Sequence, residues 1–138
     1  MDAWFDEAAT AKDPQKHINV VLTTRELRVE VSGVEVAKTN APRLLFEGDL
    51  PVYIYIRKSD VHMELLKQTE HTTRCPYKGI ANYYTLELSS GEKIDNMMWC
   101  YEEPISEEAT GIKGLFSFYD SKANLYLDGV LLAKPANR

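Results

Sequence analysis

The residues whose types could do chemistry are concentrated in one stretch, His71 to Gly79, which reads HTTRCPYKG. Histidine and cysteine side chains have unperturbed pKa values of about 6.5 and 8.5, so they are the most easily tuned to act near neutral pH. His71 could be a general base, and Lys78 could stabilise an anion that develops opposite it. Residue types alone do not distinguish such a site from a polar loop with Tyr77 packed over it.

Two residues restrict the backbone of this stretch. Pro76 fixes the chain after Cys75 and Gly79 permits a tight exit, so we expect a loop that holds its side chains in fixed directions. Cys75 is also a candidate nucleophile. Covalent catalysis is the weaker alternative, because no second motif identifies the base that it would need.

The elements that must position this stretch are short strands. Leu27, Val29 and Val31 alternate with polar residues, which is the pattern of a half-buried strand. Turn signals at Ser32-Gly33, Ser89-Ser90-Gly91 and Asp128-Gly129 separate further expected strands at 52–56, 83–88, 94–101, 115–119 and 125–132. Single helical turns are expected near 59–61 and 106–109. The pattern predicts a mainly β fold, a small barrel or a folded pair of sheets, over residues 18–138.

The first 17 residues differ from the rest of the chain. Trp4, Phe5 and Ala8 could form one short amphipathic helix, which Asp13-Pro14 would end. This segment is acidic and has no apolar core, so we expect neither a secretory signal nor a transit peptide.

Composition narrows the function classes. The 138 residues carry a formal charge of −5, with 16 Lys+Arg against 21 Asp+Glu and no basic run, so we expect no nucleic-acid partner. No apolar run approaches the roughly 18 residues of a membrane span. Cys75 and Cys100 lack CxxC spacing, which favours free thiols and a cytoplasmic location over a single disulfide.

Two aromatic positions suggest a pocket. Trp99 and Tyr101 lie two apart on an expected strand and should share a face, as core or as pocket wall. The chain is rich in other tyrosines, whose flat rings and polar tips suit a pocket for a flat organic ligand. The ligand-binding candidates are Tyr53, Tyr55, Arg74, Trp99, Tyr101 and Tyr119.

A metal site would need a cluster of ligands. Asp60, His62 and Glu64 alternate, so they would share a face if they formed a strand. A turn at Asp60 and a solvated surface is the favoured interpretation, and we expect no metal site.

Two elements carry a resemblance to a known family. They are Cys75-Pro76-Tyr77-Lys78-Gly79 and Asn96-x-x-Trp99-x-Tyr101, and in-order matches include Ala37-Lys38-Thr39, Arg43, Glu47-Gly48, Pro51-Val52-Tyr53, Asp60-Val61, Leu65-Leu66, Pro104, Gly114 and Phe118-Tyr119. Over about 25–127 the chain resembles the domain of unknown function 427 family, sometimes labelled nucleotidyltransferase-like. The resemblance implies a small, mostly antiparallel β fold of tent or open-barrel type, and supplies no reaction.

This sequence departs from the family pattern at two places, so the ligand preference of the family cannot be carried over to it. The family's basic position could be filled by Arg57 or Lys58, and Asp120-Ser121 stands where Trp-Asp is usual, which could re-polarise one pocket wall. Nucleotidyl transfer has little support, because the chain has no Asp-x-Asp pair, no P-loop and no GxGxxG.

The favoured hypothesis is a small cofactor-independent enzyme that acts on an organic metabolite by acid–base chemistry, of the isomerase, cyclase, lyase or hydrolase type. Its catalytic candidates are His71, Lys78, Cys75, Tyr77, Arg57 and Asp60. The alternative is a non-catalytic small-molecule binding or interaction module, and nucleotide binding is a third possibility. The sequence leaves a homodimer open.

Overall fold

The computed structural model describes residues 18–134, which form three antiparallel sheets. The first sheet has the order β1-β4-β5, the second β11-β10-β2-β3 and the third β6-β7-β8-β9. The strands are β1 (Ile18–Leu22), β2 (Leu27–Val31), β3 (Val34–Thr39), β4 (Arg43–Glu47), β5 (Tyr53–Tyr55), β6 (Leu66–Cys75), β7 (Gly79–Glu87), β8 (Lys93–Cys100), β9 (Phe116–Phe118), β10 (Asn124–Leu127) and β11 (Val130–Leu131). The prediction of a compact, mainly β domain is confirmed.

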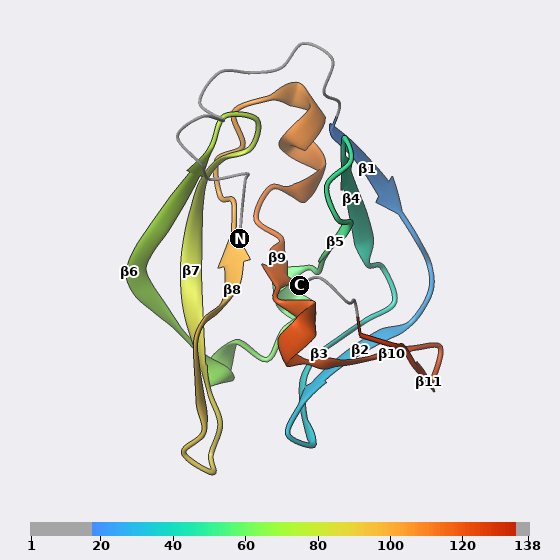
Figure 1. Ribbon diagram of the computed structural model, residues 1–138, viewed down its shortest axis with the longest axis vertical. Coiled ribbons are helices and arrows are strands. Elements are labelled where there is room, and N and C mark those ends of the chain that lie inside the picture. The colour runs from blue at the N-terminus through green and yellow to red at the C-terminus, as the bar shows by residue number, and fades with distance from the viewer. Residues whose placement is uncertain (1–17, 135–138) are drawn as a thin grey trace.

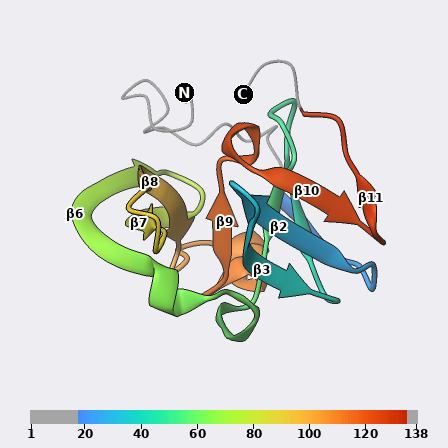
Figure 2. The ribbon, with the colours of Figure 1, turned by 90° about the horizontal axis from the view of Figure 1, so that it is seen from below.

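The β6–β9 sheet stands on one side of the molecule and the other two sheets on the other (Figure 1). β9 lies between the two sides, as the view from below also shows (Figure 2). Ile56, which follows β5, and Phe116 exchange two backbone hydrogen bonds of 2.8 Å. This bridge ties the third sheet to the first, so the sheets enclose a common interior without closing into a barrel within the described residues.

The expected turns are confirmed. Ser32 and Gly33 both have positive φ, as do Asp128 and Gly129, which is the geometry that tight two-residue hairpins require. The expected helical turns are short 3₁₀ helices, Lys58–Asp60 and the longer Glu107–Ile112; two more are Met63–Leu65 and Asp120–Lys122. The proposed helix in residues 1–17 lies outside the described residues.

The expectation of a loop from His71 to Gly79 is wrong for its first half. His71 to Cys75 belong to β6, and only 76–78 form the turn into β7, with Cys75 paired to Gly79. β6 is an edge strand, so its polar side chains can face solvent while its backbone pairs with β7. Polar composition therefore concealed a strand.

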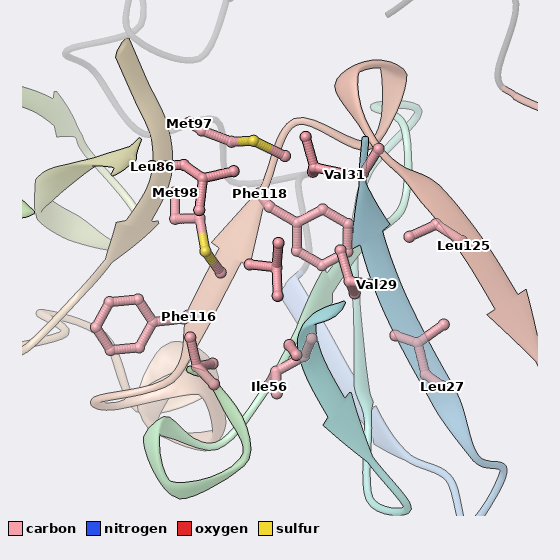
Figure 3. Close-up of a cluster of buried hydrophobic side chains, with 14 of the residues drawn as sticks. Leu27, Val29, Val31, Ile56, Leu86, Met97, Met98, Phe116, Phe118 and Leu125 are labelled. Carbon is pink, nitrogen blue, oxygen red and sulfur yellow. The ribbon is translucent and has the colours of Figure 1, made fainter. Parts of the chain in front are cut away.

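The interior divides into two clusters of buried side chains. The aliphatic cluster, drawn in Figure 3, is built from Leu27, Val29, Val31, Val36, Ala37, Ile56, Val61, Leu86, Leu88, Met97, Met98, Cys100, Phe116, Phe118, Ala123 and Leu125. The aromatic cluster is built from Ile18, Leu45, Tyr53, Tyr55, Cys75, Tyr77, Ala81, Tyr83, Trp99, Tyr101, Ala109, Ile112 and Leu115.

Strand β8 contributes to both clusters. Met98 and Cys100 lie in the aliphatic cluster, whereas Trp99 and the following Tyr101 lie in the aromatic cluster. Just before them, Asn96 has φ 51° and the pairing of β7 with β8 shifts register. The side chain of Thr69 donates a hydrogen bond of 2.7 Å to the Asn96 side chain and holds this irregularity in place.

Candidate functional site

Trp99 is the centre of the aromatic cluster. Its ring centroid lies 4.8 Å from that of Tyr119, 5.5 Å from that of Tyr53 and 6.0 Å from that of Tyr83. Its Nε1 donates a hydrogen bond of 3.2 Å to the hydroxyl of Tyr55. The tilted and edge-on ring arrangements are those that aromatic pairs prefer, so Trp99 holds rings from β5, from β7 and from the residue after β9 in one packed group.

The tyrosines of this group stay neutral at physiological pH. Burial raises the pKa of Tyr55 and of Tyr101 well above the usual value, and it also raises the pKa of Tyr83. A neutral phenol keeps its proton and can donate a hydrogen bond. The cluster therefore offers flat surfaces and hydroxyl donors, but no phenolate base.

A buried ion pair lies against these rings. Lys78 Nζ lies 2.7 Å from Glu47 Oε1, and the two side chains are 0% and 1% exposed. Lys78 lies in the turn after β6, and Glu47 is the last residue of β4. The next residue, Gly48, has a φ of 54° and begins the turn that follows β4. Lys78 Nζ is also 5.6 Å from the ring centroid of Tyr101. Its charge is thus already matched by a carboxylate inside the protein.

The Cys75 thiol is buried next to this pair. Burial raises its pKa, although the charge of Lys78 and hydrogen bonds from the backbone amides of Tyr77 and Lys78 partly oppose the rise. Burial also raises the pKa of Cys100 to about 12, and both cysteines are free, as the sequence predicted. Since the thiolate is the nucleophile, this environment does not favour covalent catalysis by Cys75.

Two buried hydroxyls near these groups have no hydrogen-bond partner among the described residues. They belong to Tyr101 and Ser117, both 0% exposed. Ser117 pairs with Trp99 on one side, and the bridge between Ile56 and Phe116 brings Tyr55 to its other side. An unsatisfied buried hydroxyl costs about 1–3 kcal/mol, so each invites a functional explanation.

The rim of the cluster is formed around Tyr83. The exposed His71 ring packs 4.6 Å from the Tyr83 ring, and the Thr73 and Tyr83 hydroxyls lie 3.0 Å apart. Burial raises the pKa of the half-buried Tyr119, and the neighbouring Tyr83 hydroxyl partly opposes this rise. Among the predicted catalytic residues, His71 is the one that is exposed and also contacts the cluster.

Arg57 and Asp60 lie elsewhere, in a polar pocket of about 240 Å³ that Thr39 and Asn40 also line. Arg57 Nε and Nη2 donate to Asp60 Oδ2 at 2.9 and 2.7 Å, and Thr39 donates to the same oxygen at 2.7 Å. Burial acts to raise the pKa of Asp60, but these hydrogen bonds prevail and lower it. Arg57, and not Lys58, therefore pairs with Asp60.

Arg74 and His62 also fall outside the aromatic cluster. Arg74 lies on the outer face of β6, away from its predicted place among the ligand-binding rings. His62 Nε2 contacts Glu35 at 2.8 Å and its Nδ1 lies 3.7 Å from Glu64. Among residues 18–134 no group of three histidine, cysteine, aspartate or glutamate side chains is arranged to hold a metal ion.

Sequence reasoning gave no role to two residues of this site. Glu47 has a signal, because it stands in the family resemblance, but its partner Lys78 is 31 positions away. Ser117 has no sequence signal, because a serine within a strand does not indicate which side chains will pack around it.

Comparison with known proteins agrees with the resemblance. The family model described as "Domain of unknown function (DUF427)" matches residues 19–129, which is most of the chain. No curated protein matches. Within the described residues, no helix combines the length and apolar character needed to cross a membrane.

Proposed function

The chain belongs to the DUF427 family, and from the geometry of its aromatic cluster we propose that it binds a flat organic molecule there. The observation that carries this proposal is the buried Tyr101 hydroxyl, which lacks a partner among the described residues and lies beside the Lys78–Glu47 pair. A ligand atom that accepts a hydrogen bond would remove the cost of that burial.

The chemistry of the cluster defines the ligand class. Its tyrosines are neutral, and Lys78 and Glu47 cancel each other, so a charged ligand would gain no unmatched countercharge inside. Trp99 and Tyr119 pack on each other with ring centroids 4.8 Å apart, and a flat ligand would join this group beside the half-buried Tyr119 ring. The best match is a neutral heteroaromatic or quinone-like molecule whose edge carries a carbonyl oxygen. Entry would take place at the rim, beside Tyr119 and His71.

Fluorescence of Trp99 gives a direct test. Trp4→Phe removes the other tryptophan, and this variant is titrated with neutral flat amides and carbonyl heteroaromatics such as nicotinamide, uracil and isatin. We expect saturable quenching by at least one probe. Tyr101→Phe should weaken that binding about tenfold, which corresponds to one hydrogen bond.

Tyr84→Phe is the matched control for this titration. Tyr84 is next to Tyr83 on β7 but packs on Phe116 in the other cluster, 4.9 Å between ring centroids. Its substitution should leave the affinity unchanged. Unsaturable quenching by every probe, or equal affinities of the Tyr101→Phe variant and its parent, would contradict the proposal.

Acid–base catalysis is a second candidate, and the contact of His71 with Tyr83 favours it. In this arrangement His71 would transfer the proton at the rim, because Lys78 is held by Glu47 and the Cys75 pKa is raised. Arg57 and Asp60 would take no part, since they line a different pocket.

Proton exchange tests the catalytic candidate without knowledge of the product. A bound probe with an acidic C–H bond would exchange that hydrogen for deuterium in D₂O, followed by NMR. His71→Gln should abolish the exchange, whereas His62→Gln, at a half-buried histidine paired with Glu35, should not. Equal exchange in both variants would remove His71 from the mechanism.

A further inference from the structure

A second hollow lies on the opposite face of the β6–β7 hairpin. It has a volume of about 580 Å³ and is lined by Arg74, Ile80, Asn82, Glu102, Glu103 and Ile105. Side chains alternate across a strand, so Arg74 and Ile80 point outward while Cys75 and Ala81 point into the aromatic cluster. We name this hollow the outer groove. Its volume is typical of a site for a small organic ligand.

The floor of the outer groove is Gly79. Its φ is +106°, and an added Cβ would lie 3.1 Å from the Glu103 carbonyl oxygen and 3.3 Å from Ile105 Cγ2. Glycine thus lets the segment 102–105 approach the hairpin closely. Ser106 Oγ donates a hydrogen bond of 2.6 Å to the Tyr77 carbonyl, which fixes this segment against the turn. The groove is therefore formed before any ligand arrives.

The walls of the outer groove are apolar. Ile80 is 56% exposed and Ile105 is 60% exposed, and both line the groove. Covering an exposed isoleucine contributes about 25 cal/mol for each Å² removed from water. These two side chains provide the surface for an apolar ligand body.

The charges at the groove are complementary to a zwitterion. Asn82 donates a hydrogen bond of 2.9 Å to Glu102, so that carboxylate is already engaged. In residues 18–134 the Arg74 guanidinium and the Glu103 carboxylate form no hydrogen bond or ion pair, although both are exposed at the groove. One cation and one anion are therefore left to bind groups of opposite charge.

We propose that the outer groove binds a small zwitterion with an apolar body, of the size of an apolar dipeptide with free ends. The ligand carboxylate pairs with Arg74, its ammonium pairs with Glu103, and its apolar side chains cover Ile80 and Ile105. This site is separate from the aromatic cluster, because Arg74 and Ile80 lie on the other face of β6 and β7, and Glu103 and Ile105 belong to the exposed segment that follows β8.

NMR titration of the ¹⁵N-labelled chain with leucyl-leucine tests the proposal. We expect saturable shifts of the Ile80 and Ile105 amide signals at millimolar probe concentration. Arg74→Gln and Glu103→Gln should each weaken binding about fivefold, as for the loss of one exposed ion pair. N-acetylation or C-amidation of the probe should have the same effect as losing Glu103 or Arg74, respectively.

Lys67→Gln is the matched control, since Lys67 is an exposed cation on β6 that does not line the groove. It should bind the probe like the unsubstituted chain, as should Tyr101→Phe. Absence of saturation at about 10 mM would overturn the proposal. So would full affinity for the capped probes, or equal affinities of the Arg74→Gln and Lys67→Gln variants.

Discussion

The two halves of the interior use different chemistry. The aliphatic cluster packs branched side chains, methionines and phenylalanines, which need no hydrogen-bond partners (Figure 3). Each cluster holds one buried cysteine, but the aromatic cluster also encloses an ion pair and two hydroxyls that lack hydrogen-bond partners among the described residues. Buried polar groups cost free energy, and proteins accept such costs mainly at functional sites. This difference is the reason why we propose the ligand site for the aromatic half and a mainly stabilising role for the aliphatic half.

The ion pairs show the same contrast. Lys78 and Glu47 are 0% and 1% exposed in the aromatic half, whereas Arg57 and Asp60 are 46% and 21% exposed beside the aliphatic half. Solvent screens the second pair but hardly reaches the first. Similar N–O distances of 2.7 Å therefore correspond to very different energies.

The largest effect is expected from breaking the buried pair. Glu47→Ala leaves the Lys78 charge unpaired in the interior and should lower the free energy of unfolding by about 3–5 kcal/mol. The double variant Glu47→Leu/Lys78→Met should recover most of that loss, because no charge then remains to be compensated. Urea unfolding measures the stability of both variants. A loss below about 1 kcal/mol for Glu47→Ala would contradict the expectation that Lys78 depends on Glu47 for charge compensation.

A core truncation in the other half sharpens the comparison. Leu86→Ala in the aliphatic cluster should cost about 2–5 kcal/mol, from lost burial and the cavity left behind. Affinity for a ligand of the aromatic cluster should not change in the molecules that remain folded. A large affinity loss, measured well below the unfolding midpoint, would mean that the two halves are not independent.

Removing the Tyr101 hydroxyl should affect stability in the opposite direction to the two substitutions above. Tyr101→Phe deletes a buried polar atom that has no partner in residues 18–134, so stability should hold or rise by as much as about 1–3 kcal/mol. Tyr55→Phe is the control. It removes the acceptor of the Trp99 indole and should lower stability by about 1–3 kcal/mol. Equal losses in both variants would indicate that the Tyr101 hydroxyl is satisfied in solution.

The smallest effect is expected at the exposed pair. The pKa of Asp60 is lowered in the folded state, so its contribution is present above the unfolded value of 3.8 and is lost as the pH falls through the folded pKa. Asp60→Asn should remove less than about 1 kcal/mol at neutral pH and less still at pH 2, because part of the carboxylate is then protonated. Urea unfolding at both values checks this, and a pH-independent cost would exclude the carboxylate charge as its source.

The sequence predicted features that depend on near neighbours. The alternation at Leu27, Val29 and Val31 identified β2, and Asp128-Gly129 identified the turn between β10 and β11, because strand period and turn chemistry are local. Two-residue spacing also placed Trp99 and Tyr101 on one face. The resemblance added the family, and its residues include both members of the buried pair.

Features that depend on distant pairing could not be predicted. The polar residues from His71 to Cys75 form a strand only because β7 is available beside them. Arg57 and Asp60 resembled members of the same site as Lys78, yet they satisfy each other at the surface. The sequence shows which residues are charged, but the arrangement of the sheets decides which residues of opposite charge pair with each other.

Strand β8 has a consequence for how this chain can diversify. Alternate residues face different clusters from Met98 to Tyr101, whereas Met97 and Met98, which follow the irregularity at Asn96, both lie in the aliphatic cluster. A substitution at Trp99 is therefore expected to act on the aromatic cluster, and one at Met98 on stability. A single-residue insertion or deletion between Met98 and Trp99 is expected to act differently, because it would turn the indole toward the aliphatic cluster. With the ligand site that we propose, point substitutions along β8 could change specificity, while the length of the strand between these two positions has to stay fixed.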